Sequence, residues 1–403
     1  MNPRFTCPYP YKDNPTCAGT GILYTTATDL NSLFGFPPNP ATITNFSSAN
    51  LPLTGTTGVT GYPSHPKTIV NYRYSLEWDY ELPYKLMANL GYQGSQMRHL
   101  LIQNNWNVIG AYKGYAMNPA VNFLDFYENS GNGNYNAMVA TLTHNFANNF
   151  MTQVQYTWAK AMDENSGPYY MDVYPYNTHA AYGRSNYNVQ DALKLYGLWQ
   201  PAFFRGNSML EKVLGGWSLG GIWNWHTGFP WNPIYNTVSN IYYQGSRYGQ
   251  LRPTNHLGGA GTATSNSTFQ GFGKVNPNYS GDGTQYFPGP TYVIGATFPA
   301  TSPAPVPGIH RNSLNGPHYN DVDASLTKSF GLPRMPVLGE NATFSFRADA
   351  YNLFNKLNIN PSSINGTLGS VNPNGTTVPE SAFGVAGSGL GSRTVQLQAR
   401  FNF

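Results

Sequence analysis

The stretch that decides the fold is Val70–Leu82, VNYRYSLEWDYEL, in which apolar or aromatic residues alternate strictly with polar ones. Its even-numbered positions hold Val, Tyr, Tyr, Leu, Trp, Tyr and Leu, and its odd-numbered positions hold Asn, Arg, Ser, Glu, Asp and Glu. Successive side chains of a β-strand point to opposite faces, so this stretch predicts a strand with one apolar face and one polar face.

The same alternation recurs at residues 150–158, 343–350 and 394–403. The strands expected around these runs span about 10–14 residues, which is roughly twice a typical globular strand but suits a tilted membrane strand. Aromatic residues also stand at the ends of the runs, where the aromatic girdles of a membrane barrel belong: Tyr80, Trp158, Trp217, Trp225 and Phe403. Alternation alone does not separate a membrane barrel from a soluble sandwich.

Composition leaves two classes of protein open. Charged residues are only 10% of the chain, aromatic residues are 15%, and the mean hydropathy is −0.39. No run approaches the roughly 18–20 apolar residues of a membrane helix. These values suit a barrel wall with lipid on one side and water on the other, or a secreted β protein. The net charge of +4 and the absence of Lys/Arg runs argue against nucleic-acid binding.

The connections between the expected strands alternate in length, and this decides the class. Short links fall at residues 82–84 and 147–149, and moderately short links near 206–207 and 333–340. Long stretches rich in Gly, Pro, Asn and Tyr occupy residues 96–133, 164–187, 228–318 and 357–391. A compact soluble domain rarely carries several such loops, whereas short periplasmic turns and long outer loops are typical of bacterial outer-membrane barrels.

We therefore predict an all-β, antiparallel transmembrane β-barrel in the bacterial outer membrane. Its crossings are expected at residues 68–82, 85–95, 134–146, 150–162, 189–203, 214–227, 320–331, 342–355 and 392–403. A further strand pair hidden near residues 234–243 would leave the count odd. Single-chain bacterial barrels have even counts, so we expect an incomplete arc, the C-terminal part of a larger barrel. Residues 1–67 are expected to be an irregular outer-loop segment, and residues 68–403 barrel strands and loops, without a plug or a signal peptide.

Several motifs give this arc a family resemblance, and they occur in order over residues 66–403. Those motifs are YQGSQMRHL at 92–100, YNA at 135–137 with YTWAKAMD at 156–163, GGWSL at 215–219 with TGFP at 227–230, RNSLNGP at 311–317 with DASLTK at 323–328, and FRADAYNLFN at 346–355. Together they resemble the barrels of Oar-like TonB-dependent receptors of Acidobacteria, in the carboxypeptidase-regulatory-like domain family.

This resemblance implies a barrel of about 22 strands, a plug, and a preceding β-sandwich domain. It also implies outer-membrane lipid as the surroundings, contact with the missing N-terminal barrel strands and plug, and coupling to TonB only through that N-terminal part. The implied function is uptake or binding of an unidentified nutrient, such as a glycan or a chelate. A non-transporting surface or adhesion-type protein, and a secreted soluble carbohydrate-binding protein, remain alternatives.

No catalytic or metal-binding pattern stands out in the sequence. The eight histidines are scattered, although His310 and His318 flank the RNSLNGP loop. The acidic pairs Asp163–Glu164 and Asp321 with Asp323 could bind Ca²⁺ or act in acid–base chemistry, but they suit charges at the wet ends of strands better. We expect no enzyme, no catalytic residue, no cofactor and no metal.

Two positive signals remain. Trp223, Trp225 and Trp231 cluster at the start of the longest expected loop, as ligand contacts or as part of an aromatic girdle. The terminal run offers apolar residues at alternate positions up to an aromatic last residue, and it resembles the signal read by the barrel-assembly machinery: Val395, Leu397, Ala399, Phe401 and Phe403. Whether Cys7 and Cys17 form a disulfide stays open.

Overall fold

The structure is a computed structural model. It describes residues 4–5, 58–63, 65–105, 123–147, 149–167, 181–202, 208–237, 250–252, 284–285, 310–332, 342–371, 377–380 and 382–402. Cys7, Cys17 and Phe403 lie outside these residues, as does most of the expected outer segment 1–67.

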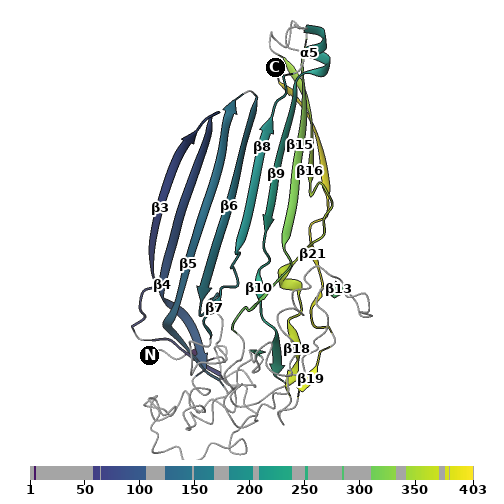
Figure 1. The fold of residues 1–403 in the computed structure, drawn as a ribbon. Coiled ribbons are helices and arrows are strands. Elements are labelled where there is room, and N and C mark those ends of the chain that lie inside the picture. Colours follow the sequence, from purple (N-terminus) through teal and green to yellow (C-terminus); the bar gives the residue numbers. More distant parts are fainter. Residues whose placement is uncertain are drawn as a thin grey trace, which may run out of the picture.

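The molecule is built on one large sheet whose long strands are antiparallel and follow one another in chain order (Figure 1). These strands are β3 (Val70–Leu82), β4 (Leu86–Asn105), β5 (Phe123–Ala147), β6 (Phe150–Asp163), β8 (Asp191–Trp199), β9 (Trp217–His226), β15 (Tyr319–Gly331), β16 (Thr343–Tyr351) and β22 (Thr394–Asn402). Every expected crossing has its strand among them. The short strands β1 (Arg4–Phe5), β2 (Gly58–Gly61) and β7 (Gly183–Arg184) complete the twelve-stranded sheet.

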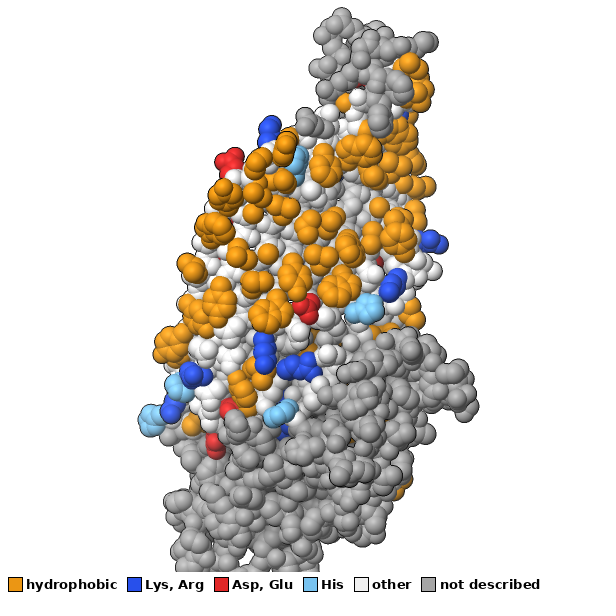
Figure 2. All heavy atoms as spheres, viewed as in Figure 1, with side chains coloured by type: hydrophobic (Ala, Val, Ile, Leu, Met, Phe, Trp, Pro, Cys, Tyr) orange, Lys and Arg blue, Asp and Glu red, His pale blue; other side chains and the backbone are white. Residues whose placement is uncertain are grey.

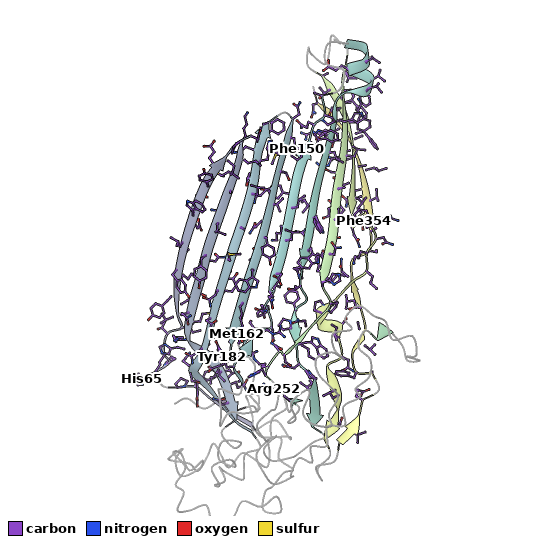
Figure 3. The ribbon with its side chains drawn as sticks, in the orientation of Figure 1. His65, Phe150, Met162, Tyr182, Arg252 and Phe354 are labelled. Atoms are coloured by element: carbon purple, nitrogen blue, oxygen red, sulfur yellow. The ribbon has the colours of Figure 1, made fainter. Side chains whose placement is uncertain are left out.

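The short links lie at one end of the sheet and the long ones at the other (Figure 1). Leu82 pairs with Leu86 across the first short turn, and Ala147 pairs with Phe150 across the second. Asn149 in that second turn has a φ of 64°, a left-handed conformation that Asn tolerates well. Strand β6 runs from Phe150 at the turn end to Met162 at the loop end (Figure 3). The turn end is the periplasmic end of a bacterial barrel, and the described C-terminal strand ends there.

Register gives the sheet two chemically distinct faces. One row of directly paired residues across neighbouring strands is apolar throughout: Tyr80, Ala88, Leu142, Val154, Leu195, Trp223 and Val322. The next row, which points to the opposite face, is polar throughout: Asp79, Asn89, Thr141, Gln155, Lys194, Asn224 and Asp321. In Figure 2 hydrophobic side chains gather over the sheet face turned to the viewer, and Lys, Arg and His lie mostly toward its ends.

We call the apolar side the outward face and the polar side the inner face. Large apolar side chains on the outward face, such as Leu76, Trp78 and Leu397, are exposed to the surroundings of the chain. Among the described residues, the edge strand β3 pairs only with β4, and β22 pairs only with β16. The described sheet is therefore an open arc of barrel wall.

The loop end differs from the expected pattern because β4 and β5 continue well beyond the predicted crossings 85–95 and 134–146. Their ladder extends to Asn105 opposite Asp125, after a bulge between Arg98 and Leu100 in which His99 has a φ of 61°. Part of the expected loop 96–133 is thus a long hairpin. Alternation did not predict it, because backbone pairing beyond the membrane needs no apolar face.

The other long outer loops pair with one another through short strands. In one small sheet β11 (Ile234–Thr237) lies between β12 (Gln250–Leu251) and β18 (Thr367–Val371), and β18 pairs with β19 (Thr377–Pro379). The suggested hidden strand pair at 234–243 is therefore wrong for its described part, since β11 belongs to this loop sheet and not to the barrel wall.

Three further pairs tie the loops together. These are β10 (Pro230–Trp231) with β14 (Leu314–Asn315), β13 (Thr284–Gln285) with β20 (Val385–Ala386), and β17 (Asn358–Ile359) with β21 (Gly389–Leu390). The helical elements within the described residues are α5 (Ser208–Leu214) and the 3₁₀ turn η6 (Pro361–Ser363). In the described part of the chain, neither is long and apolar enough to span a bilayer.

Candidate functional site

The inner face of the sheet carries a small pocket near its loop end, with a volume of about 220 Å³ and a lining of both polar and apolar side chains. Strands β5, β6 and β8 supply most of its wall, and the segment just before β8 closes one side. Tyr135, Tyr187 and Lys194 are its largest side chains, and the remaining lining residues are Gln155, Thr157, Ala159, Ala161, Asn188, Val189 and Ala192.

The chemistry of this pocket follows from strand alternation. Gln155, Thr157 and Ala161 point to the inner face of β6. Lys194 pairs with Gln155 and Tyr135 pairs with Ala161, so their side chains point to the same face. Aromatic rings, an amide, a hydroxyl and an ammonium group are therefore within one concave surface. Such a set can stack on a sugar ring, hydrogen-bond to hydroxyl groups and attract a carboxylate.

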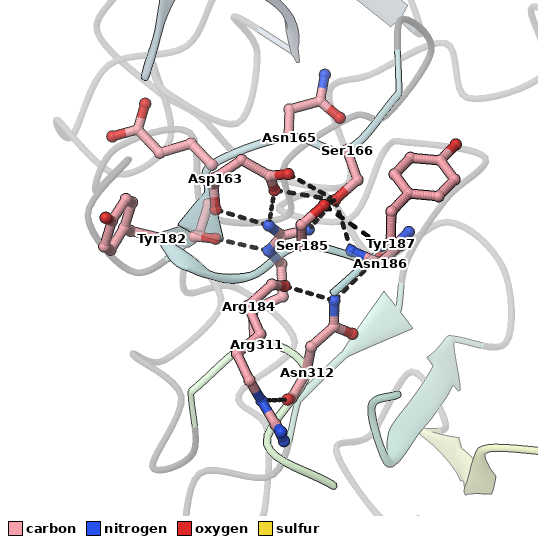
Figure 4. A network of polar contacts seen from close by, with 12 residues as sticks. Asp163, Asn165, Ser166, Tyr182, Arg184, Ser185, Asn186, Tyr187, Arg311 and Asn312 are labelled. Atoms are coloured by element: carbon pink, nitrogen blue, oxygen red, sulfur yellow. Dashed lines mark hydrogen bonds and ion pairs between the residues drawn. The ribbon is translucent and has the colours of Figure 1, made fainter. Parts of the chain in front are cut away.

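On the loop side of the pocket, a buried arginine connects three outer segments through hydrogen bonds (Figure 4). Only 1% of the Arg311 side chain is exposed, and its guanidinium forms an ion pair with the carboxylate of Asp163. Nε donates to the carbonyl of Ala181 at 2.8 Å, Nη1 to Oγ of Ser166 at 3.1 Å, and Nη2 to the carbonyl of Asp163 at 2.6 Å. These bonds join the end of β6, the segment before β8 and the segment before β15.

Asn312 and Arg184 extend the contact. The amide of Asn312 donates to the carbonyl of Arg184 at 2.7 Å and to Oδ1 of Asn186 at 2.6 Å, and Nε of Arg184 donates back to the carbonyl of Asn312 at 2.7 Å. Burial lowers the pKa of Arg184 from its usual value. We call this group the loop clamp: Asp163, Ser166, Ala181, Arg184, Asn186, Arg311 and Asn312.

The interpretation of Asp163 and Glu164 as charges at a wet strand end is wrong. Both residues are buried. Asp163 accepts from Arg311 and from Oγ of Ser166, and Glu164 accepts the backbone N–H of Asn132 at 2.8 Å. Their carboxylates stabilise the loop clamp and the β4–β5 hairpin. Within the described residues, no group of three or more His, Cys, Asp or Glu side chains could hold a metal ion.

The other acidic residues and the histidines that the sequence singled out lie outside the loop clamp. Asp321 and Asp323 both lie on the inner face of β15, where Oδ1 of Asp323 accepts the backbone N–H of Asn352 at 2.9 Å. His310 and His318 are both exposed. Partial desolvation, together with the nearby charge of Lys356, lowers the pKa of His318.

The structure separates the three candidate tryptophans. Trp223 and Trp225 lie on the outward face, opposite Val322 and Asn320 of β15, and the indole N–H of Trp223 donates to Oδ1 of Asn320 at 2.7 Å. Trp231 instead lies in β10 among the outer loops, where its ring is 5.7 Å from that of Phe383. Trp223 and Trp225 thus lie on the face that a girdle requires, and both roles, girdle and ligand contact, stay predictions.

The terminal run has the expected alternation. Val395, Leu397, Ala399 and Phe401 lie on the outward face of β22, paired with Ala350, Ala348, Phe346 and Phe344 of β16. Recognition of this run by the assembly machinery stays a prediction.

Sequence reasoning did not find the loop clamp or the pocket. Asp163 ends the motif YTWAKAMD and Arg311 begins the motif RNSLNGP, but 148 residues separate them. The paired presence of one acid and one arginine at motif boundaries was the available signal.

A barrel wall with an apolar outward face, a polar inner face and paired outer loops defines an outer-membrane β-barrel. The model of the outer membrane beta barrel domain matches residues 2–396, and the chain belongs to this family. Its place is the bacterial outer membrane, which excludes the secreted soluble alternative.

Two solved structures are similar to this chain at low sequence identity. The outer membrane transporter YddB from Escherichia coli has 11% identity and a TM-score of 0.44, covering 85% of this chain and 34% of its own. The ferric-catecholate import receptor Fiu from E. coli K12 has 12% identity and a TM-score of 0.35, covering 83% of this chain and 27% of its own. The chain thus spans about a third of the length of these structures or less. No curated protein matches this sequence.

Proposed function

We propose that this chain forms the C-terminal barrel wall of an Oar-like TonB-dependent receptor that takes up a small polar nutrient, a glycan or a chelate. The ordered motifs over residues 66–403 support the family assignment. In this proposal a plug and a TonB-binding segment reside in an N-terminal part of the same receptor, and TonB acts only through that part.

The observation that carries the proposal is the pocket on the inner face, in which tyrosine rings and hydrogen-bonding groups lie together. A barrel wall that served only as an anchor needs no concave set of hydrogen-bonding groups on its inner face. Tyr135 and Tyr187 supply rings for a sugar or an aromatic chelate, Gln155 and Asn188 supply amides, and Lys194 supplies a cation. A ligand with hydroxyl groups and a carboxylate would satisfy all three kinds of contact.

A second function, binding at the cell surface without transport, is favoured by the loop clamp. Buried hydrogen bonds between loops hold the outer surface in one shape, and a pre-organised surface loses less entropy on binding. Ligand capture by the outer loops is compatible with either function. Dependence on TonB distinguishes them, because a surface-binding protein has no need of energy coupling.

The test is uptake by cells that express the complete receptor gene, with labelled oligosaccharides and ferric chelates as probes. We expect expression to confer uptake of at least one probe, and deletion of tonB to abolish it. Lys194→Gln and Tyr187→Ala should weaken uptake by raising the apparent KM, whereas Thr143→Val, an inner-face change outside the pocket, should not. Probe binding that persists at full strength without tonB and without any uptake would favour the second function.

A further inference from the structure

Helix α5 (Ser208–Leu214) lies at the periplasmic end of the sheet, in the link between β8 and β9 (Figure 1), and it contacts the end of β15. A plain turn would suffice to join two neighbouring antiparallel strands. The helix therefore calls for its own physical explanation.

Lys328 fixes the end of this helix on the outward face of the sheet. It pairs with Trp217 and Phe346, both outward-facing residues, so its own side chain is on the lipid side. Only 5% of Lys328 is exposed, because Nζ donates to the carbonyl of Val213 at 3.0 Å and to the carbonyl of Gly215. The carbonyl groups at a helix C-terminus carry partial negative charge and favour a cation there.

Backbone geometry and aromatic rings hold the same junction. Gly216 has a φ of +73°, and a Cβ at this position would lie 2.4 Å from the carbonyl oxygen of Ser329. The backbone N–H of Ser329 donates to the carbonyl of Gly216 at 2.9 Å. Nζ of Lys328 also lies 5.2 Å from the ring centre of Trp217 and 4.9 Å from that of Phe330, within cation–π range.

The helix turns an apolar stripe to its surroundings. Leu210, Val213 and Leu214 follow the i, i+3, i+4 spacing that puts side chains on one side of a helix. Val213 is 63% exposed and Leu214 is 43% exposed. Trp217 and Phe330 are also partly exposed next to the helix end, so this stripe continues the apolar surface of the outward face.

We propose that α5 is an interfacial membrane helix, which inserts Leu210, Val213 and Leu214 into the periplasmic leaflet of the outer membrane. Its partner is the phospholipid surface itself. Continuity with the lipid-facing sheet selects this partner over a protein, because the same bilayer that covers Trp217 and Phe330 reaches the helix. An amphipathic helix of this kind lies in the plane of the interface with its apolar side buried about 5–10 Å deep. Lys328 is the positioning residue that holds the helix there.

The test measures the depth of residue 213 in lipid vesicles. The full chain with Cys7 and Cys17 replaced by Ser receives Val213→Cys and an environment-sensitive fluorophore. Quenching by nitroxide-labelled phosphatidylethanolamine reports lipid contact, and quenching by iodide reports water. Leu219→Cys on the outward face and Ser218→Cys on the inner face, both in β9, are matched controls.

We expect the label at 213 to be quenched by lipid nitroxide several-fold more than the label at 218, and to resemble the label at 219, because both would lie at apolar depth. Strong quenching by iodide without quenching by lipid would overturn the proposal, since it would place the helix in water. Protection from both quenchers would also overturn it, since a protein would then cover the helix.

A second variant tests the role of Lys328. Lys328→Met keeps most of the aliphatic stem and removes the hydrogen bonds to the helix carbonyls. We expect lipid quenching of the label at 213 to fall by about half or more as the helix end is released, while Lys194→Met on the inner face leaves it unchanged. Equal quenching in the Lys328 variant and its parent would refute the positioning role.

Discussion

Replacing Arg311 by Met should open the outer loops while leaving the barrel wall folded. The side chain of Arg311 is 1% exposed and that of Asp163 is 9% exposed. Among the described residues, the variant would leave the buried carboxylate with Oγ of Ser166 as its remaining side-chain donor. Removing one partner of a buried ion pair costs about 3–5 kcal/mol. Methionine restores part of the packing, so we place the loss in free energy of loop opening at about 3 kcal/mol.

Hydrogen exchange in lipid vesicles measures this loss locally. The backbone N–H of Asn186 donates to Oγ of Ser166, and that of Asn312 donates to Oδ1 of Asn232, so both amides report opening of the loop clamp. A loss of about 3 kcal/mol corresponds to roughly two orders of magnitude in the opening equilibrium, and amides in the middle of β6 should not change.

Arg347→Met is the matched control, because Arg347 also pairs with an aspartate, Asp349, but half of its side chain is exposed. An exposed pair of this kind contributes about 0–1 kcal/mol. We also predict that the double variant Asp163→Leu with Arg311→Met loses less free energy of loop opening than Arg311→Met alone, since no unpaired charge stays buried. Equal effects of the Arg311 and Arg347 variants, or a double variant less stable than the single one, would refute it.

Two further predictions concern the wall and the loop end. Val154→Arg, on the outward face, should lower the free energy of unfolding in vesicles by about 2–4 kcal/mol, whereas Gln155→Arg on the inner face should change it little; equal losses in urea titrations would contradict the assignment of the faces. The pKa of His318 is lowered in the folded chain by partial desolvation and by the charge of Lys356, so the unfolded chain binds the proton more readily. The contribution of neutral His318 to the free energy of unfolding should therefore be complete above the unfolded pKa of about 6.5 and decline as the pH falls below it. His318→Gln should flatten this decline, and an unchanged pH profile would exclude His318 as its source.

The barrel wall could be predicted from sequence because each side chain of a membrane strand faces either lipid or the inner side, and the residue type at each position follows that environment. Tyr80 faces lipid and Asp79 faces the inner side, and each continues as an apolar or a polar row across the neighbouring strands. Period-2 alternation is a local property, so a window of ten residues contains it. The same property located the strands on both sides of each short turn.

The loop end could not be predicted in this way. Beyond His99 the β4–β5 hairpin is held by backbone hydrogen bonds. Ile102, Gln103 and Asn104 follow one another in β4 and are all buried, so both faces are covered and the sequence carries no alternation. The pairing of β11 with β18 joins segments that are far apart in the chain. Nothing in either short segment indicates its partner, and tertiary packing of the loops decides the outcome.

The environment of Asp163 was predicted wrongly for a related reason. Asp163 was identified as a chemically notable residue, but its environment was misjudged because its partner Arg311 follows 148 residues later. A carboxylate at a strand end is solvated when no cation reaches it and buried when one does. The local sequence is the same in both cases, so only the fold distinguishes them.

Polar residues on the outward face show how lipid constrains what alternation allows. Asn136 lies there at the outer rim, and its Oδ1 accepts from the hydroxyls of Tyr74 and Tyr92 at 3.0 and 2.9 Å. At the opposite rim Lys328 donates to helix carbonyls. An unsatisfied polar group in hydrocarbon costs several kcal/mol, and lipid tails offer it no hydrogen bond. Each of these residues breaks the apolar pattern at an edge of the belt and finds its partner within the chain, which is the arrangement that a membrane boundary imposes and a water-facing surface would not.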